Sequence, residues 1–330
     1  MNKKTTLKDI AGICGCSVTT VARALKDSDT ISAAMRKKIQ DTALELGYIP
    51  NSLATSMRTG RTNTIGVILQ DFRNPYFAVI AKYIEEYARI KNYSIFFMTT
   101  NESSVRELEA CRSMIGKNVD GILLFPVQED DRSVQLLLSQ STPFVLVSRY
   151  FEHLDTSYVV SDEEAGTYMV TKHLIEKGAQ NIVFLNGPEY IYSAHHRQIG
   201  YLRALNESGL SPNIIPTGTK IGETAEQIHN LENNKIPYDG ILTFCDMMGY
   251  EAYHTLSDLG YQIPGDKLLA GHDGLHQDMI YPLNLTTAML DRQQLAHAAI
   301  DMILDIIENP DSEKQQVCLK QTLFIGDTTT

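Results

Sequence analysis

The body of the sequence, from residue 64 onward, alternates between two kinds of hydrophobic pattern. Short runs rich in β-branched and aromatic residues, such as TIGVILQD and DGILLFP, are typical of buried strands. Between them, apolar residues recur every three or four positions, as expected of amphipathic helices. The predicted strands are 64–71, 93–100, 120–126, 143–149, 181–187, 239–245 and 268–273. The predicted helices are 75–91, 103–117, 162–177, 194–208, 223–234, 246–259 and 291–308.

Strands and helices that alternate in this way form parallel sheets with helices on both faces. Two such sets predict an α/β body made of two doubly wound parallel-sheet sub-domains. We expect the first to cover about 63–160 and 290–319, and the second about 161–289 and 320–330. Ligands of this architecture bind beyond the carboxyl ends of the strands. Neither a GxGxxG nor a phosphate-binding loop sequence occurs, so we predict no nucleotide and no other cofactor.

The first fifty residues instead predict short helices. Thr6 can cap the first helix with Asp9 as its capping-box partner, and Gly15 can end it in a left-handed conformation. The apolar stripe of this helix is Leu7, Ile10, Ala11 and Cys14. Ser17 caps a second helix, predicted over 18–26. Because only two residues separate these helices, they form a helix-turn-helix arrangement.

A third helix follows, capped by Ser32 and ended by Gly47. Its predicted inner face is Met35, Ile39, Ala43 and Leu46, and Arg36, Lys37 and Lys38 fall outside that face. Residues 1–50 therefore predict an all-α helix-turn-helix domain.

The second helix has one side suited to a core and one suited to a partner. Val21, Ala24 and Leu25 share the inner side. The outward side carries small or polar side chains that can reach base edges in a DNA major groove, and a plain helical surface without a ligand is the alternative. The predicted DNA-contact residues of this domain are Thr6, Ser17, Val18, Thr19, Thr20, Ala22 and Arg23.

Charge divides the chain at nearly the same place as the hydrophobic pattern. The 330 residues carry a net charge of −11, but residues 1–62 contain ten Lys and Arg against five Asp and Glu, which is +5. The remaining residues therefore carry −16. Because the acidic body would repel a polyanion, double-stranded DNA is expected to contact the basic head alone.

The stretch TLKDIAGICGCSVTTVARAL, with the later LGYIPN and TGRTNTIGV, resembles the lactose/galactose repressor family of bacterial transcription regulators. Cys16 departs from the family's usual Val, and Ala22 from its usual Ser, which removes a hydroxyl that could donate to phosphate or base. The matching residues are Thr6, Asp9, Ile10, Ala11, Gly15, Ser17, Thr20, Val21, Arg23, Leu46, Gly47, Tyr48, Pro50 and Asn51.

Residues 51–62 form the predicted hinge and contain too few apolar residues to fold alone. The resemblance implies that this segment becomes helical on DNA, where Met57 would wedge between base pairs in the minor groove and kink the duplex. Ala54 would lie beside it, and Asn51 and Arg58 could bind phosphate. A simple linker rich in Ser and Thr is the alternative.

The resemblance extends over 63–330, which looks like a periplasmic sugar-binding protein with its ligand between two sub-domains. The family motifs matched are N-P-[FY]-[FY], S-x-x-x-R-x-x-G-[YF] and G-[FY]-D. A strand-end carboxylate that accepts hydrogen bonds from sugar hydroxyls fits this chemistry. The resemblance implies effector contacts by Tyr76, Phe77, Ser148, Ser193, Arg197, Cys245, Asp246 and Asp273.

Several positions depart from the family's effector pattern. Cys245 stands where the family usually has Asn, and a thiol cannot donate and accept as an amide does. Ser148 stands where Asp is common, and Gly274 replaces a frequent second Asp. Residues 323–328 lack the arginine of the family's final motif. We therefore expect a pocket that is not tuned to the best-known sugars of the family.

The cysteines and the two histidines near residue 272 could be metal ligands, but their spacing does not indicate a metal site. The five cysteines are scattered in sequence and predict free thiols in a reducing compartment. Cys14 and Cys16 lack a third ligand nearby, and His272 and His276 follow a strand and not a helix, so we predict no metal site.

The remaining polar pairs do not indicate catalysis. Glu163 and Glu164 are acids at a helix N-terminus, where the helix dipole favours them. His195 and His196 precede Arg197 at the start of a predicted helix and could reach either a pocket or solvent. No Ser/His/Asp or Cys/His set occurs in a catalytic motif, so we do not predict an enzyme.

Together these features predict a sequence-specific transcriptional repressor that binds a pseudo-palindromic operator as a homodimer. A small-molecule effector, a sugar or a sugar derivative, would control it. Helices 75–91 and 103–117 are the predicted dimer face, with helix 162–177 added by resemblance. No apolar run of 18 residues and no apolar leader segment occur, so we expect a cytoplasmic protein without a membrane partner.

Three alternatives stay open at this point. Control by a corepressor or by a protein partner would fit the same sequence. A solute-binding protein for transport would fit the body but not the basic head. An enzyme of sugars would need a catalytic carboxylate pair that no motif provides. No leucine heptads follow residue 310, which favours a dimer over a tetramer.

Overall fold

The computed structural model describes residues 5–25, 30–49, 60–277 and 283–330 of the chain. The residues separate into two units, Met1–Thr62 and Asn63–Thr330. Each unit has hydrophobic core clusters of its own. Among the described residues, no helix combines the length and the apolar character needed to span a membrane.

Local capping interactions define the first helix, α1 (Leu7–Cys14). The Thr6 hydroxyl accepts from the Asp9 amide at 3.4 Å, and the Asp9 carboxylate accepts from the Thr6 amide at 2.8 Å. The helix ends at Gly15, where φ is 70°. These interactions satisfy backbone groups that a helix end leaves unpaired, and they confirm the predicted capping box and the left-handed glycine.

The next two helices complete the basic head. Helix α2 (Val18–Ala24) starts at Ser17, whose hydroxyl accepts from the Thr20 amide at 3.1 Å, as predicted. Helix α3 (Ala33–Glu45) starts after Ser32, whose side chain makes no capping hydrogen bond in the structure.

The head buries a small core where its helices meet, and two details differ from the prediction. Helix α2 ends at Ala24, two residues earlier than predicted. Leu46 is 37% exposed because it lies beyond the last turn of α3, and Thr42 is buried instead, with its hydroxyl donating to the Lys38 carbonyl at 2.8 Å. The buried apolar residues are Ile10, Ala11, Cys14, Val21, Ala24, Ile39 and Ala43.

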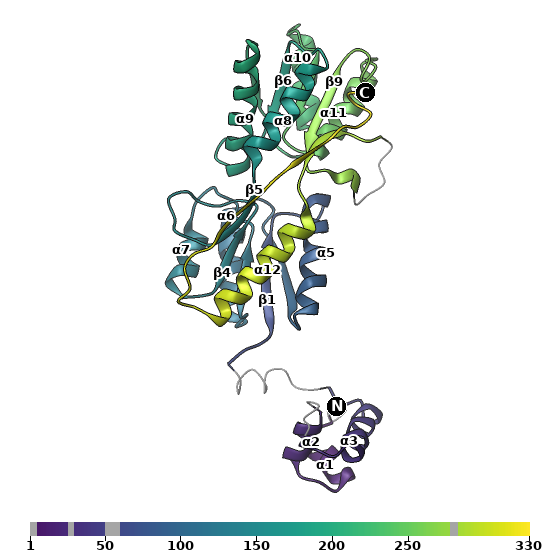
Figure 1. Ribbon diagram of the computed structural model, residues 1–330, viewed down its shortest axis with the longest axis vertical. Coiled ribbons are helices and arrows are strands. Elements are labelled where there is room, and N and C mark those ends of the chain that lie inside the picture. Colours follow the sequence, from purple (N-terminus) through teal and green to yellow (C-terminus); the bar gives the residue numbers. More distant parts are fainter. Residues whose placement is uncertain (1–4, 26–29, 50–59, 278–282) are drawn as a thin grey trace. The chain divides into compact units, whose positions relative to one another are not determined.

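The first sheet of the body has the described strand order β11-β5-β4-β3-β1-β2, with every pair parallel. Its strands are β1 (Thr64–Leu69), β2 (Ser94–Thr99), β3 (Gly121–Leu124), β4 (Phe144–Val147), β5 (Tyr158–Ser161) and β11 (Gln316–Leu319). One face packs against α5 (Pro75–Ile90) and α12 (Arg292–Glu308), and the other against α6 (Ser104–Gly116) and α7 (Arg132–Ser139) (Figure 1). Such two-sided cover explains why the strand sequences are almost continuously apolar.

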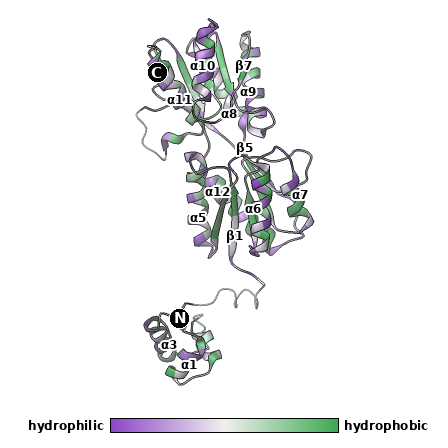
Figure 2. Ribbon diagram, turned by 180° about the vertical axis from the view of Figure 1, so that it is seen from behind, coloured by the Kyte–Doolittle hydropathy of each residue, from purple (hydrophilic) through white to green (hydrophobic). Residues whose placement is uncertain are grey.

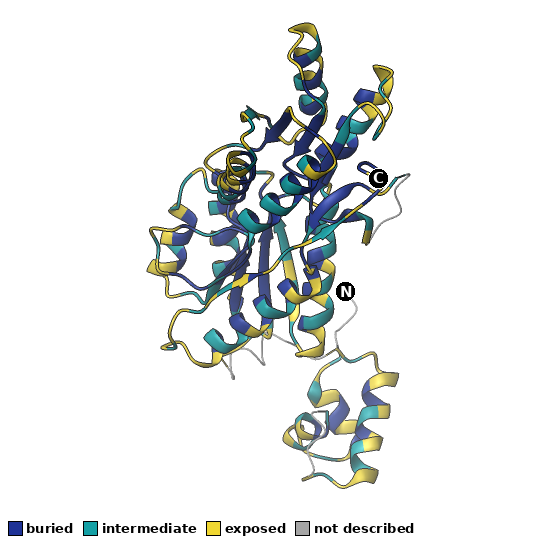
Figure 3. Cartoon of the chain, turned by 45° about the horizontal axis from the view of Figure 1, so that its top comes forward, coloured by how far each residue is buried: buried dark blue, intermediate teal, exposed yellow. Residues whose placement is uncertain are grey.

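The second sheet has the described order β12-β10-β9-β8-β6-β7. Its strands are β6 (Ile182–Asn186), β7 (Asn213–Pro216), β8 (Gly240–Thr243), β9 (Leu268–His272), β10 (Thr286–Met289) and β12 (Thr322–Phe324). Helices α8 (Glu163–Glu176) and α9 (Tyr192–Ser208) pack on one face, and α10 (Glu223–Asn233) and α11 (Asp246–Asp258) on the other. The central strands of both sheets are hydrophobic (Figure 2) and mostly buried, the edge strands β2, β7, β11 and β12 are more exposed, and the helices turn exposed faces outward (Figure 3).

The hydrophobic pattern does not predict the shorter elements of the body. The strands β5, β7, β10, β11 and β12 have three or four residues, and polar residues interrupt them, whereas the equally short β3, β4 and β8 lie in longer apolar runs of the sequence. The pattern also does not predict the eight-residue helix α7. The second sheet is also not purely parallel, because β12 pairs with β10 in the antiparallel direction.

The chain passes between the two sheets at 161–163, 289–292 and 319–322. The first passage joins β5 to α8, the second joins β10 to α12, and the third joins β11 to β12. These three segments connect the two sheets, so a change in the relative position of the sheets has to be accommodated in them.

Candidate functional site

The outward side of α2 is accessible. Val18 is 44% exposed, Thr19 and Arg23 are also exposed, and Ala22 is half-buried. The hydroxyl of Thr20 lies 2.9 Å from that of the capping serine, so it is already part of the cap. The surface predicted to contact DNA therefore consists of short side chains and one guanidinium group.

Other polar groups of the head hold its helices together. The Thr6 hydroxyl donates to the Asp9 carboxylate at 2.6 Å. Lys38 Nζ donates to the carbonyl of Cys14 at 3.2 Å, where a cation is favoured by the C-terminal end of α1. Arg36 Nη2 donates to a backbone carbonyl before α3 at 3.3 Å. Two of the three basic residues predicted to lie outside the inner face of α3 thus have structural contacts.

The four predicted hinge contacts, Asn51, Ala54, Met57 and Arg58, lie outside the described residues. Their roles in minor-groove binding stay predictions.

The predicted effector residues lie beyond the carboxyl ends of strands in both sheets. The first sheet contributes Tyr76, Phe77 and Ser148. The second sheet contributes Ser193, Arg197, Cys245, Asp246 and Asp273. All are buried except the half-buried Tyr76 and Ser148.

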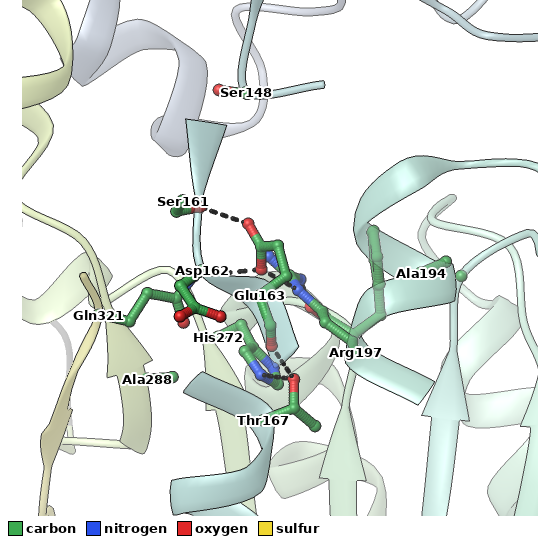
Figure 4. Close-up of polar contacts among 12 residues, drawn as sticks. Ser148, Ser161, Asp162, Glu163, Thr167, Ala194, Arg197, His272, Ala288 and Gln321 are labelled. Atoms are coloured by element: carbon green, nitrogen blue, oxygen red, sulfur yellow. Dashed lines mark hydrogen bonds and ion pairs between the residues drawn. The ribbon is translucent and has the colours of Figure 1, made fainter. Parts of the chain in front are cut away.

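Arg197 brings a positive charge into this group. Its Nε donates to Oε2 of Glu163 at 2.7 Å, and both side chains are buried (Figure 4). Its Nη1 donates to the carbonyl of Phe244, whose ring centre lies 4.7 Å from the guanidinium Cζ. A buried arginine needs such a counter-ion because an unpaired charge inside a protein is costly.

Glu163 is a residue of this group that the sequence pattern does not single out. The Ser161 hydroxyl donates to its Oε1 at 2.5 Å, and Gln321 Nε2 donates to its Oε2 at 3.1 Å. Its neighbour Glu164 pairs instead with Arg203 at 2.5 Å. Both acids fit the same interpretation as helix-dipole partners, because nothing in the local sequence separates them. A buried arginine needs a counter-ion, so the sequence indicates that some acid pairs with Arg197. Only the fold shows that this acid is Glu163.

Asp273 has an unfilled hydrogen-bonding position. Its φ is 119°, a conformation that non-glycine residues rarely adopt. Its backbone carbonyl accepts from Arg292 Nη1. Its Oδ2 is buried and has no hydrogen-bond partner among the described residues. Burial raises the pKa of Asp273, although the nearby Arg197 and Arg292 oppose that rise. Such a group can bind a ligand that supplies the missing partner.

Tyr76 and Ser148 bring the first sheet to the same place. Their hydroxyl oxygens lie 3.2 Å apart, and either can donate. Burial raises the pKa of Tyr76 to about 12, and the negative charges of Glu163 and Asp273 add to the rise. The phenol of the first sheet therefore interacts electrostatically with the carboxyl groups of the second.

Two predicted effector residues have internal contacts that build the walls of the site. The fully buried Asp246 carboxylate accepts from the Thr287 hydroxyl at 2.8 Å and from the Leu275 amide at 2.9 Å. Phe77 lies on α5 and packs into the core of the first sheet, with its ring centre 6.0 Å from that of Phe125. Direct contact of Asp246 or Phe77 with an effector stays a prediction.

The histidines considered as metal ligands have other partners. His272 Nε2 lies 2.9 Å from the Thr167 hydroxyl and Nδ1 lies 3.2 Å from the Thr243 carbonyl. Burial lowers the pKa of His272 well below its ordinary value. His276 stacks on Phe324, with ring centres 3.7 Å apart. Within the described ranges, no group of three His, Cys, Asp or Glu residues could hold a metal ion, and the cysteines are free thiols.

Two cavities lie next to other parts of the body. One of about 440 Å³ is lined by residues that include Tyr83, Asp291 and Thr322. The other, of about 240 Å³, is lined by residues that include Tyr150 and Tyr192. None of the predicted effector residues lines either cavity. The predicted effector residues form a polar cluster, which is instead connected by an ion pair and hydrogen bonds of the protein itself.

Comparison with protein families gives two matches that together cover most of the chain. Residues 62–328 match the family described as periplasmic binding proteins and sugar binding domain of LacI family. Residues 6–51 match the family described as bacterial regulatory proteins, lacI family. The two matches meet near the division between the basic head and the acidic body.

Individual relatives are similar over nearly their whole length. The chain is 28% identical over 315 residues to the HTH-type transcriptional repressor PurR of Glaesserella parasuis serovar 5 (strain SH0165), covering 94% of this chain and 92% of that protein. It is 27% identical over 336 residues to the ribose operon repressor of Haemophilus influenzae (strain ATCC 51907 / DSM 11121 / KW20 / Rd), covering 98% of each.

Solved structures show the same fold. The crystal structure of the lac repressor dimer bound to operator and the anti-inducer ONPF has a TM-score of 0.89 at 23% identity, with 99% of each chain covered. A complex of the transcriptional regulator CelR with cellobiose has a TM-score of 0.74 at 23% identity, covering 98% of this chain and 100% of that chain.

Proposed function

The chain belongs to the lacI family of bacterial regulatory proteins, and from this premise we propose that it is a transcriptional repressor controlled by a small molecule. It binds a pseudo-palindromic operator as a homodimer in the cytoplasm, and the effector is a sugar or a sugar derivative. The main support is the capped helix-turn-helix of a basic head, with Val18, Thr19 and Arg23 exposed on the outward side of α2. Short side chains there allow the helix backbone to approach base edges closely.

The dimer places two copies of α2 against two half-sites, so the operator has the two-fold symmetry of the protein. The two hinge segments pair at the centre of the operator, where Met57, with Ala54 beside it, wedges into the minor groove and bends the DNA. Asn51 and Arg58 add phosphate contacts beside them.

Effector control follows from the position of the polar cluster. Tyr76 and Ser148 follow strands of the first sheet, whereas Arg197 and Asp273 belong to the second. A ligand that contacts both sets binds more tightly to one relative position of the sheets than to another. Its binding therefore shifts the population between two conformations of the body. That shift changes the spacing of the two hinges and thereby the affinity for the operator.

The test is selection of bound duplexes from random DNA by the purified full-length protein, first without ligand. We expect enrichment of a near-palindrome with a fixed, easily kinked centre. Repeating the selection with a pool of sugars and sugar phosphates separates an inducer, which lowers the enrichment, from a corepressor, which is required for it. No enrichment under either condition would contradict the proposed function.

A further inference from the structure

The cation of the proposed effector site is already paired with a residue of the protein. Arg197 Nε donates to Glu163 at 2.7 Å, and Nη1 donates to the Phe244 carbonyl. Among the described residues, its Nη2 has no hydrogen-bond partner. One donor of the fork is therefore available to a ligand, while the charge of the guanidinium is neutralised by a buried carboxylate.

Glu163 is held in this position from several sides. The hydroxyl of Ser161 donates at 2.5 Å and Gln321 Nε2 donates at 3.1 Å, and both residues lie where the chain passes between the sheets (Figure 4). Packing around Gln321 is tight, because a Cβ built at Gly166 would overlap its side chain. An anionic ligand at the remaining donor of Arg197 would bring a second negative charge into the buried site beside Glu163, and the single guanidinium cannot neutralise both charges, which is unfavourable.

The other polar groups of the site favour ligands that donate hydrogen bonds. Asp273 Oδ2 is buried and has no partner among the described residues, so it requires a donor. Tyr76 and Ser148 offer two hydroxyls at 3.2 Å from each other. Arg292, the second cation nearby, donates to the backbone carbonyls of Asp273 and Gly274. Both neighbouring guanidinium groups are thus engaged with the protein itself.

We propose that Glu163 makes the site selective for uncharged, hydroxyl-bearing effectors and excludes phosphorylated or carboxylate-bearing ones. The proposal rests on the proposed function only in placing the effector at this polar cluster. Glu163 acts through Arg197: it neutralises the guanidinium and leaves Nη2 free to donate to a ligand hydroxyl. Glu163 is therefore a specificity-determining residue. Its hydrogen bonds with Ser161 and Gln321 also hold it to two of the segments that connect the sheets.

The test uses inorganic phosphate as the probe, measured by thermal unfolding of the full-length protein against sodium chloride of the same ionic strength. In Glu163→Gln, the neutral amide retains the size of the side chain and frees the charge of Arg197. We expect this variant to bind phosphate at least about tenfold more tightly than the wild type, because a guanidinium–phosphate pair is a strong charge-assisted contact. The double variant Glu163→Gln with Arg197→Gln should lose the gain, which excludes phosphate binding at the basic head.

The matched control is Glu164→Gln, the adjacent acid of the same helix, which pairs with Arg203 instead. It should bind phosphate no better than the wild type. An equal gain in both single variants, or no gain in Glu163→Gln, would overturn the proposal. So would a wild-type protein that binds phosphate through Arg197.

A second measurement does not depend on the folding of any variant. Calorimetry on the wild type compares free sugars with their phosphates and with the corresponding uronic acids. A charged sugar that binds more tightly than its uncharged counterpart would refute the proposal. Failure of the proposed function has a different signature, since it would appear as the absence of DNA enrichment and would leave the phosphate gain of Glu163→Gln unaffected.

Discussion

Arg23 supplies the only charge on the outward side of α2, and its side chain is exposed. We expect Arg23→Ala to weaken binding to the selected operator by about 1–3 kcal/mol and to relax the preference at one base position, as for a direct base contact. Competition assays with operator and random duplexes measure both effects. The control is Lys37→Ala, an exposed cation on α3. Equal losses of Arg23→Ala on operator and random DNA would identify a phosphate contact instead.

Glu107 is a buried carboxyl group away from the effector site. It lies on α6, and its Oε2 accepts from the Val127 amide at 2.6 Å. Burial raises the pKa of Glu107 to about 7, although the Val127 amide, Ser133 and the charge of Arg149 oppose the rise. In the unfolded chain the group loses its proton near its ordinary value of 4.5, whereas the folded chain retains it to higher pH.

Protonation of Glu107 therefore makes stability depend on pH. The folded chain binds more protons between the two pKa values, so the free energy of unfolding falls as the pH rises through that interval and levels off above it. Between about pH 5 and about pH 8, we expect Glu107→Gln to gain about 1–3 kcal/mol relative to the wild type. Urea unfolding at both pH values measures this difference. Glu109→Gln, an exposed acid on the same helix, should show no such change.

At the scale of elements, α8 and α9 approach each other closely at Gly200. A Cβ built at Gly200 of α9 would overlap the backbone carbonyl oxygen of Glu164 on α8. Because a backbone atom cannot rotate away as a side chain can, the absence of a side chain at this position sets the distance between the two helices. The same two helices carry Glu163 and Arg197, so their separation also sets the geometry of the ion pair.

We expect Gly200→Ala to lower the free energy of unfolding by about 1–3 kcal/mol through overpacking, measured by urea unfolding. Gly116→Ala is the matched control, because Gly116 ends α6 and a Cβ there would meet no atom within 4 Å. That change should be neutral or stabilise the helix by up to about 1 kcal/mol. Similar losses in both variants would show that helix contact is not the cause.

At the scale of the whole molecule, one edge of the first sheet has the features of an association surface. Strand β2 is the edge strand, and Phe96 on it is 50% exposed. Ile90 at the end of α5 is 71% exposed and Val105 on α6 is 58% exposed. These elements flank the edge and include the two helices predicted as the dimer face. An unpaired strand edge with exposed apolar side chains favours association with a second chain.

Phe96→Lys places a charge on this edge, and we expect it to raise the dimer dissociation constant by about tenfold or more. Sedimentation equilibrium measures the change, and operator binding should weaken in parallel because both half-sites are needed. Leu138→Lys alters a comparably exposed apolar residue on α7 and should leave the dimer intact. A wild type that stays monomeric at all concentrations, or equal effects of both changes, would contradict the predicted dimer face.

The sequence alone determined the features that depend on near neighbours. The capping box of Thr6 and Asp9, the left-handed Gly15 and the Ser17 cap follow from hydrogen bonds within one helical turn. The longer strands and helices of the body follow from hydrophobic periods that repeat along the chain. These patterns and the uneven charge are sufficient to predict the helix-turn-helix head and the α/β body and to identify the family resemblance.

Tertiary structure decided which distant groups meet. Glu163 and Glu164 are equivalent in local sequence, but one is the buried partner of Arg197 and the other pairs with Arg203. Packing also places Asp273 Oδ2 in the interior without a hydrogen-bond partner among the described residues. The burial of Glu107 likewise raises its pKa. The physical reason is that the energy of a charge depends on its solvent exposure and on its partners, and both are set by the packing of segments far apart in sequence.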